Sequence, residues 1–98
     1  MINKFANLSY FFSHFHQDWE LDARNPEEVF DLFVRENPVE TVSRAVCELE
    51  EFLSMDLSDG ELEHTLYCEL GCYYMPDKSV REWLVFVRES LTNLMKGR

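Results

Sequence analysis

Thirteen residues near the amino terminus, YFFSHFHQDWELD at positions 10–22, decide how this chain must fold. The stretch contains five aromatic side chains: Tyr10, Phe11, Phe12, Phe15 and Trp19. Each ring can bury about 150–250 Å² of surface, so a group of this density is unfavourable in water. The core of the protein must therefore be built against this segment.

The apolar residues around these rings repeat at helical spacing, which predicts a helix over about residues 3–16. One stripe at i, i+3, i+7 and i+10 contains Phe5, Leu8, Phe12 and Phe15. Tyr10 and Phe11 widen this stripe, so we expect the helix to be buried on more than one side. The polar segment 17–24 is predicted to be an ordered loop held in place by Trp19 and Leu21.

Local start signals predict four further helices. Asn25 and Asn37 each precede a proline, and a polar cap followed by proline at the first helical position is a typical helix start. The segments 58–61 and 79–82 each place glutamate three residues after serine, the spacing of a capping box. These signals predict helices that begin after Asn25, Asn37, Ser58 and Ser79.

Apolar residues at helical spacing follow each of these starts. Gly71 is predicted to be the C′ residue that ends the helix beginning after Ser58. No stretch of the chain alternates between apolar and polar residues as a half-buried strand would. The prediction is therefore an all-α fold, a single-domain bundle of about five helices that spans residues 1–98.

Charge is the most informative bulk property of the 98 residues, because 19 acidic side chains against nine basic ones give a net charge of −10. Sixteen of the acids and only three bases lie between residues 18 and 69. Nucleic acid and anionic membranes are poor partners for such a surface, since phosphate contacts require clustered lysine and arginine. A basic protein is the expected partner, although a well-solvated surface is the simpler explanation of acidic composition.

Three cysteines, Cys47, Cys68 and Cys72, cannot all pair within one chain. No secretory signal is recognisable at the amino terminus, and no apolar run is long enough for a membrane span. We therefore expect a cytoplasmic protein with free thiols.

Two patterns suggest metal ligands. The first, HFHQD at 14–18, places two histidines at i and i+2, which point in different directions on a helix. The second places His64, Cys68 and Cys72 four residues apart, but a fourth ligand is missing and Gly71 is predicted to interrupt the helix. Glycine-rich phosphate loops and nucleophile motifs are also missing. We predict no metal, no cofactor, no small-molecule substrate and no enzymatic activity.

Four sequence blocks resemble the immunity proteins of contact-dependent growth inhibition systems, the CdiI family. They are YFF at 10–12 with FHQDW at 15–19, NPEE at 25–28, ELGCYY at 69–74 and REWL at 81–84. The resemblance implies a small cytosolic inhibitor without catalysis of its own. It implies one partner, bound one to one: the C-terminal toxin domain of a CdiA effector. A nuclease is the expected toxin activity, with a ribonuclease as the first choice.

Motif residues shared by immunity proteins that each neutralise a different toxin are expected to hold the fold and not to set specificity. We therefore expect Phe12, Phe15, Trp19, Trp83 and the turn at 71–72 to be structural. Trp19 could alternatively anchor an interface, because tryptophan is enriched at binding hot spots.

The toxin contacts are expected to come from exposed acids. The predicted toxin-binding residues are Asp18, Glu20 and Asp22 on the loop, with Glu27, Glu28 and Asp31 on the second helix. A second acidic patch competes with them: Glu48, Glu51, Asp56, Asp59, Glu61 and Glu63.

Two alternatives to the immunity function stay open. An acidic helical protein could serve as an adaptor or nucleic-acid mimic that binds a basic host factor. A small metal-dependent hydrolase would require bound zinc.

Overall fold

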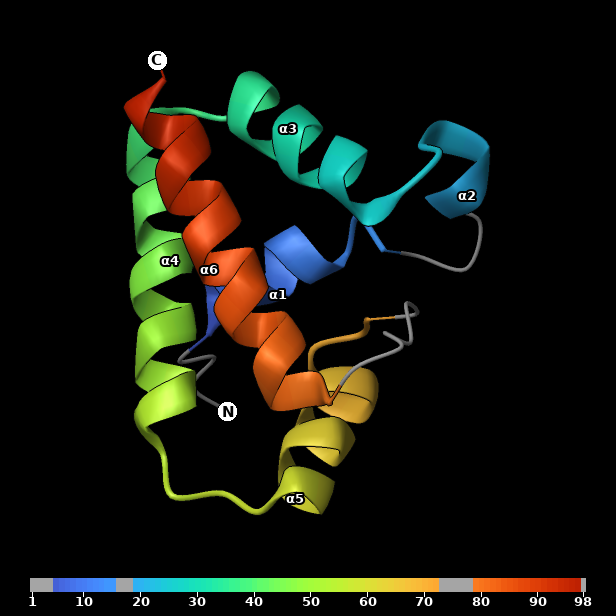
Figure 1. The fold of residues 1–98 in the computed structure, drawn as a ribbon, viewed down its shortest axis with the longest axis vertical. Helices are drawn as coiled ribbons and strands as arrows, with labels where there is room; N and C mark the ends of the chain where they lie inside the picture. The colour runs from blue at the N-terminus through green and yellow to red at the C-terminus, as the bar shows by residue number, and fades with distance from the viewer. Residues whose placement is uncertain (1–4, 16–18, 73–78, 98) are drawn as a thin grey trace.

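The computed structural model describes residues 5–15, 19–72 and 79–97, and within these ranges every regular element is a helix (Figure 1). The elements are α1 (Ala6–Phe12), α2 (Trp19–Asp22), α3 (Pro26–Glu36), α4 (Val39–Ser54), α5 (Asp59–His64), the π-helical η1 (Thr65–Glu69) and α6 (Val80–Lys96). This confirms the predicted all-α fold. The five predicted helices correspond to α1, α3, α4, α5 with η1, and α6, and α2 is an additional short turn of helix.

The two longest helices, α4 and α6, pack against each other and form the body of the fold (Figure 1). Helix α1 packs against α4, and α3 contacts both α6 and α4. Helix α5 contacts α6 at the opposite end of the body from α3 (Figure 1). No helix among the described residues is long and apolar enough to cross a membrane.

Four of the five rings of the aromatic segment lie in the core, as predicted, whereas Tyr10 is 46% exposed. The ring of Phe11 is fully buried, with its centroid 4.9 Å from that of Phe33 and 5.9 Å from that of Phe30 on α3. Trp83 of α6 approaches the same cluster through Phe12 at 6.0 Å and Phe15 at 5.7 Å. These rings and Trp19 are all buried, which confirms that they are structural residues.

The region after α1 differs from the prediction. Helix α1 ends at Phe12, and the N–H of Phe15 bonds to the carbonyl of Phe12 at 2.9 Å in a tighter turn that carries the Phe15 ring inward. Trp19 begins the helical turn α2 where a loop was predicted. The prediction that Leu21 pins this segment is wrong, since its side chain is 84% exposed.

The predicted role of Asn37 as the cap of α4 is also wrong. Its side-chain amide donates to the carbonyl of Phe33 at 2.9 Å, and its oxygen accepts from the hydroxyl of Tyr10 at 3.0 Å. Asn37 therefore closes the end of α3 and joins it to α1. Pro38 takes the cap position of α4, with its carbonyl accepting from the N–H groups of Thr41 and Val42.

Glu48 of α4 supplies the cap that α1 lacks locally. Its carboxylate accepts from the N–H of Leu8 at 2.9 Å and from the side-chain amide of Asn7 at 2.7 Å. The residue before α1, Phe5, offers no side-chain oxygen to these amides. Because unpaired N–H groups and the positive helix end favour a carboxylate, Glu48 fixes α1 on α4.

Helix α5 begins with the predicted capping box, and its continuation ends at the predicted glycine. Leu62 and Leu66 are fully buried. Gly71 has φ of +75°, the left-handed conformation that favours glycine. The N–H of Leu70 bonds to the carbonyl of Thr65, five residues back, at 2.9 Å, which is the π-helical spacing. The N–H of Cys72 then bonds to the carbonyl of Leu66 at 3.1 Å and closes the helix end across Gly71. Residues 73–78, which include the two tyrosines of the ELGCYY block, lie outside the described residues.

The capping box of α5 has a measurable acid–base consequence. The backbone N–H of Ser58, 3.0 Å from the Glu61 carboxylate, and then the Ser58 side chain lower the pKa of Glu61 below its ordinary value of 4.5. Since the folded pKa is the lower one, the stabilisation is present above the unfolded pKa and is lost as pH falls through the folded pKa. We expect Ser58→Ala to raise the pKa of Glu61 in a carboxyl NMR titration, while Ser54→Ala leaves it unchanged.

Candidate protein-binding surface

A groove lies between α1, α2 and α3, on the side of the molecule where the aromatic segment meets the start of α3. Its volume is about 480 Å³. It is lined by Tyr10, Ser13 and His14 from α1 and the turn after it, by Trp19 and Ala23 at α2, and by Val29 and Leu32 of α3. The lining is largely apolar and aromatic, which is typical of a site that receives a side chain from a partner.

Tyr10 is the most exposed aromatic residue of the groove, with 46% of its surface accessible. Its ring contacts that of His14 at a centroid distance of 5.2 Å and that of Phe33 at 5.8 Å. Its hydroxyl is held by Asn37, as described above. Tyr10 is therefore partly accessible to solvent, while its hydroxyl and its ring both contact the neighbouring helices.

The hydrogen bonds of His14 indicate which ring nitrogen carries the proton in the neutral ring. Nδ1 lies 3.0 Å from the carbonyl oxygen of Tyr10 and 3.1 Å from that of Phe11. Carbonyl oxygens only accept, so Nδ1 must carry the proton that is shared between them. In the neutral ring Nε2 is then a hydrogen-bond acceptor that the helix does not use.

Five of the six predicted toxin-binding residues lie on α2 and α3, two of the helices that border this groove. Asp18 lies outside the described residues. Glu20 and Asp22 belong to α2, which begins with Trp19. Helix α2 precedes α3 in the chain (Figure 1). Glu27 and Glu28 are in the first turn of α3, where acids favour the positive helix end, and Asp31 is one turn further on.

Two of these carboxylates already have internal partners. Glu28 accepts from the backbone N–H of Arg24 at 2.7 Å, and Asp31 pairs with Arg35 at 2.7 Å. Exposed ion pairs contribute only about 0–1 kcal/mol, and a carboxylate has roughly four acceptor positions. A partner cation could therefore join or replace these contacts at small cost.

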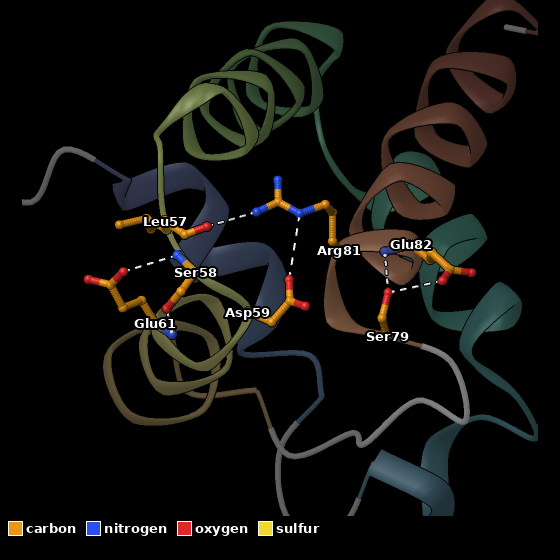
Figure 2. Close-up of polar contacts among 7 residues, drawn as sticks. All are labelled: Leu57, Ser58, Asp59, Glu61, Ser79, Arg81 and Glu82. Atoms are coloured by element: carbon orange, nitrogen blue, oxygen red, sulfur yellow. Dashed lines mark hydrogen bonds and ion pairs between the residues drawn. The ribbon is translucent and has the colours of Figure 1, made fainter.

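The second acidic patch is used more extensively to hold the fold together. Glu48 caps α1, and Glu61 belongs to the capping box of α5. Figure 2 shows Arg81 of α6 reaching across to α5, where it donates to the carbonyl of Leu57 at 2.9 Å and lies 3.8 Å from the carboxylate of Asp59. Several acids of this patch therefore satisfy backbone groups or a base of the same chain.

Both helices that meet at this junction begin with a serine cap (Figure 2). The hydroxyl of Ser79 accepts from the backbone N–H of Glu82 at 3.2 Å and also lies 3.2 Å from its carboxylate. The side chain of Glu82 thus bonds to the serine hydroxyl, which differs in detail from the box formed by Ser58 and Glu61. Arg81 lies in the first turn after this cap, so its contacts with Leu57 and Asp59 join the start of α6 to the start of α5.

Among the residues that line the groove, the sequence points only to Trp19, as an alternative interface anchor. It places Tyr10 in the core and suggests His14 only as a metal ligand, and it does not single out Leu32. One signal was available, since Glu28, Leu32 and Glu36 repeat every four residues and must share a face of α3. The groove could not be recognised without knowing that α1 and α2 border that face.

The structure contains no group of three or more metal-ligating side chains within the part of the chain that it describes. Cys68 is exposed, whereas Cys72 is buried. Cys47, on α4, is also an exposed free thiol.

Comparisons with known proteins identify relatives of the chain. A family model described as "CdiI immunity protein" matches residues 4–91. A chain in the crystal structure of a CdiA-CT/CdiI complex from Y. kristensenii 33638 is similar in fold, with a TM-score of 0.85 and 27% sequence identity. The alignment covers 91% of this chain and 99% of that one. No curated protein matches the chain.

Proposed function

The chain belongs to the CdiI immunity protein family, and from this premise we propose that it neutralises the C-terminal toxin domain of a CdiA protein by covering a basic active site with its acidic surface. The toxin is proposed to be a nuclease, with a ribonuclease as the first candidate. The chain acts as a non-enzymatic inhibitor in the cytoplasm and binds one toxin domain.

The distribution of charge carries the electrostatic part of this proposal. Residues 18–69 contain sixteen acidic and three basic side chains, so the net charge of this segment is −13. Most of these acids lie on α3, α4 and α5. A nuclease that binds phosphates needs a positively charged groove, to which carboxylates can bind in place of phosphates. Opposite fields also accelerate association, which favours an inhibitor that must act before the toxin does.

Salt dependence tests the electrostatic contribution. We expect the dissociation constant for the toxin domain encoded beside this chain to rise by about tenfold or more between 50 and 300 mM NaCl, mainly through slower association. Binding kinetics measured with an inactive toxin variant would give both rate constants. Salt-independent binding would rule out the electrostatic mechanism, and failure to bind would rule out the function itself.

Competition tests whether the active site is covered. The inactive toxin domain would be loaded with a fluorescent single-stranded RNA oligonucleotide and titrated with this chain. We expect the RNA to be displaced in proportion to complex formation. A ternary complex that retains the RNA would show instead that binding occurs beside the active site.

The alternative is an acidic adaptor or nucleic-acid mimic that binds a basic host factor. Growth separates the two functions, because expression of the chain should rescue cells that produce one particular toxin domain. An adaptor would not restore their growth.

A further inference from the structure

We propose that the groove between α1, α2 and α3 receives an arginine side chain of the toxin domain, held between the aromatic lining and the carboxylates of Glu28 and Glu36. This inference rests on the proposed function and identifies where on the acidic surface the main contact is made.

Glu28 and Glu36 are the acids of α3 that lie on the same helix face as the groove. Leu32 lines the groove. Residues four apart lie above one another on a helix, so Glu28 and Glu36 flank Leu32 on the same face, one turn to either side. Glu27 lies about 140° from Leu32 around the helix axis and therefore belongs to another face. Glu36 is exposed at the last turn of α3.

The other walls of the groove suit a guanidinium group. Tyr10 is 46% exposed and its hydroxyl bonds to Asn37. A planar cation can stack on an aromatic ring of this kind. His14 directs Nδ1 to two carbonyl oxygens, which leaves Nε2 of the neutral ring as an acceptor. Carboxylates, an aromatic face and a lone-pair nitrogen together favour a cation with several N–H donors.

Charge complementarity supports arginine over an apolar side chain as the occupant. A purely apolar occupant would remove water from the edge of the groove, where Glu28 and Glu36 lie, without supplying a cation to either carboxylate, which is costly. Arginine combines an apolar stem that can cover Val29 and Leu32 with a charged end that pairs with the carboxylates. The exposed side chain of Leu21 on α2 adds an apolar surface in the adjoining segment.

Ser13 provides a way to block the groove from its exposed rim. Its hydroxyl bonds only to the carbonyl of Tyr10, three residues back, at 2.5 Å. We expect Ser13→Trp to raise the dissociation constant for the toxin domain by about 100-fold, the loss typical of a blocked hot spot. Ser54 is a matched control, because it is also exposed at a helix end and bonds to the carbonyl three residues back at 2.7 Å. Ser54→Trp should change affinity by less than about threefold.

Charge at the same position distinguishes a cationic from an apolar occupant. Ser13→Lys should weaken binding by about tenfold or more relative to Ser13→Glu, because only lysine repels the incoming arginine. The same two substitutions at Ser54 should differ by less than about threefold. Equal weakening by Ser13→Lys and Ser13→Glu would overturn the cationic occupant.

One carboxylate of α3 and one of α4 provide a second comparison that does not alter groove shape. Glu36→Gln and Glu50→Gln each remove one negative charge from an exposed side chain, so they change the net charge equally. We expect Glu36→Gln to raise the dissociation constant by about tenfold and Glu50→Gln by less than about threefold. The reverse order would overturn the assignment of the contact face. Thermal unfolding of all variants checks that they fold.

Double-mutant cycles identify the occupant. Surface arginines of the toxin domain would be replaced one at a time by lysine, and each variant measured against the wild-type chain and against Ser13→Trp. We expect one arginine whose replacement weakens binding to the wild-type chain but not to Ser13→Trp. If no arginine behaves in this way, the groove inference fails while toxin binding by the wild-type chain still supports the proposed function.

Discussion

Phe11→Ala is expected to lower the free energy of unfolding by about 3–5 kcal/mol, the cost of removing a fully buried phenylalanine. The ring of Phe11 touches four others, those of Phe12, Phe15, Phe30 and Phe33, at centroid distances of 4.9–5.9 Å. No single neighbour can move to fill the space, since each is held by further rings. Domains of this size are stable by only about 5–15 kcal/mol, so the loss is a large fraction of the total.

Urea unfolding followed by circular dichroism at 222 nm measures this effect. Leu21→Ala is the matched control, because it also truncates a large apolar side chain but one that is 84% exposed. We expect the control to change the free energy of unfolding by less than about 0.5 kcal/mol. Equal effects of the two substitutions would contradict the assignment of Phe11 to the centre of the core.

Glu48→Ala is expected to destabilise the protein by about 1–3 kcal/mol, because it leaves the N–H of Leu8 and the amide of Asn7 without their carboxylate. The same substitution removes a negative charge from the amino-terminal end of α1. Glu48→Gln should cost less, since an amide oxygen can still accept one of the two bonds. Glu50 is exposed on the same helix, so Glu50→Ala is the control and should be nearly neutral.

Hydrogen exchange locates the effect of Glu48→Ala. Amides of α1 should exchange faster in this variant, whereas those at the centre of α6 should respond only to the loss of global stability. Uniform acceleration throughout the chain would mean that Glu48 does not specifically hold α1 against α4.

Most helix boundaries of this protein could be predicted because their causes are local. The side chain of Asn25 accepts from the N–H of Glu28, and Ser58 and Ser79 make the same contact within their own first turns. Such bonds join residues only three apart, so spacing along the chain is sufficient to recognise them. Leu62 of α5, Leu66 of η1 and the left-handed Gly71 after η1 follow from equally short-range rules.

The candidate site could be predicted only in part. The charge of the acidic residues of α3 and their expected exposure made them candidates from the sequence. Glu27 and Glu28 are exposed in the structure. Which of the acids border a groove depends on what packs beside α3, and no property of α3 alone reveals that α1 and α2 do so.

For side chains with more than one attainable partner, the tertiary structure decided which partner they bond to. Asn37 is of a residue type that commonly caps helices and stands before α4, yet it bonds to Phe33 and to Tyr10, which is 27 residues away. Glu48 resembles any exposed acid in the sequence but caps a helix 40 residues distant. The physical reason is the same in both cases: a polar group bonds to whichever partner the packed core brings within about 3 Å, and that core is formed by rings from α1, α3 and α6 together.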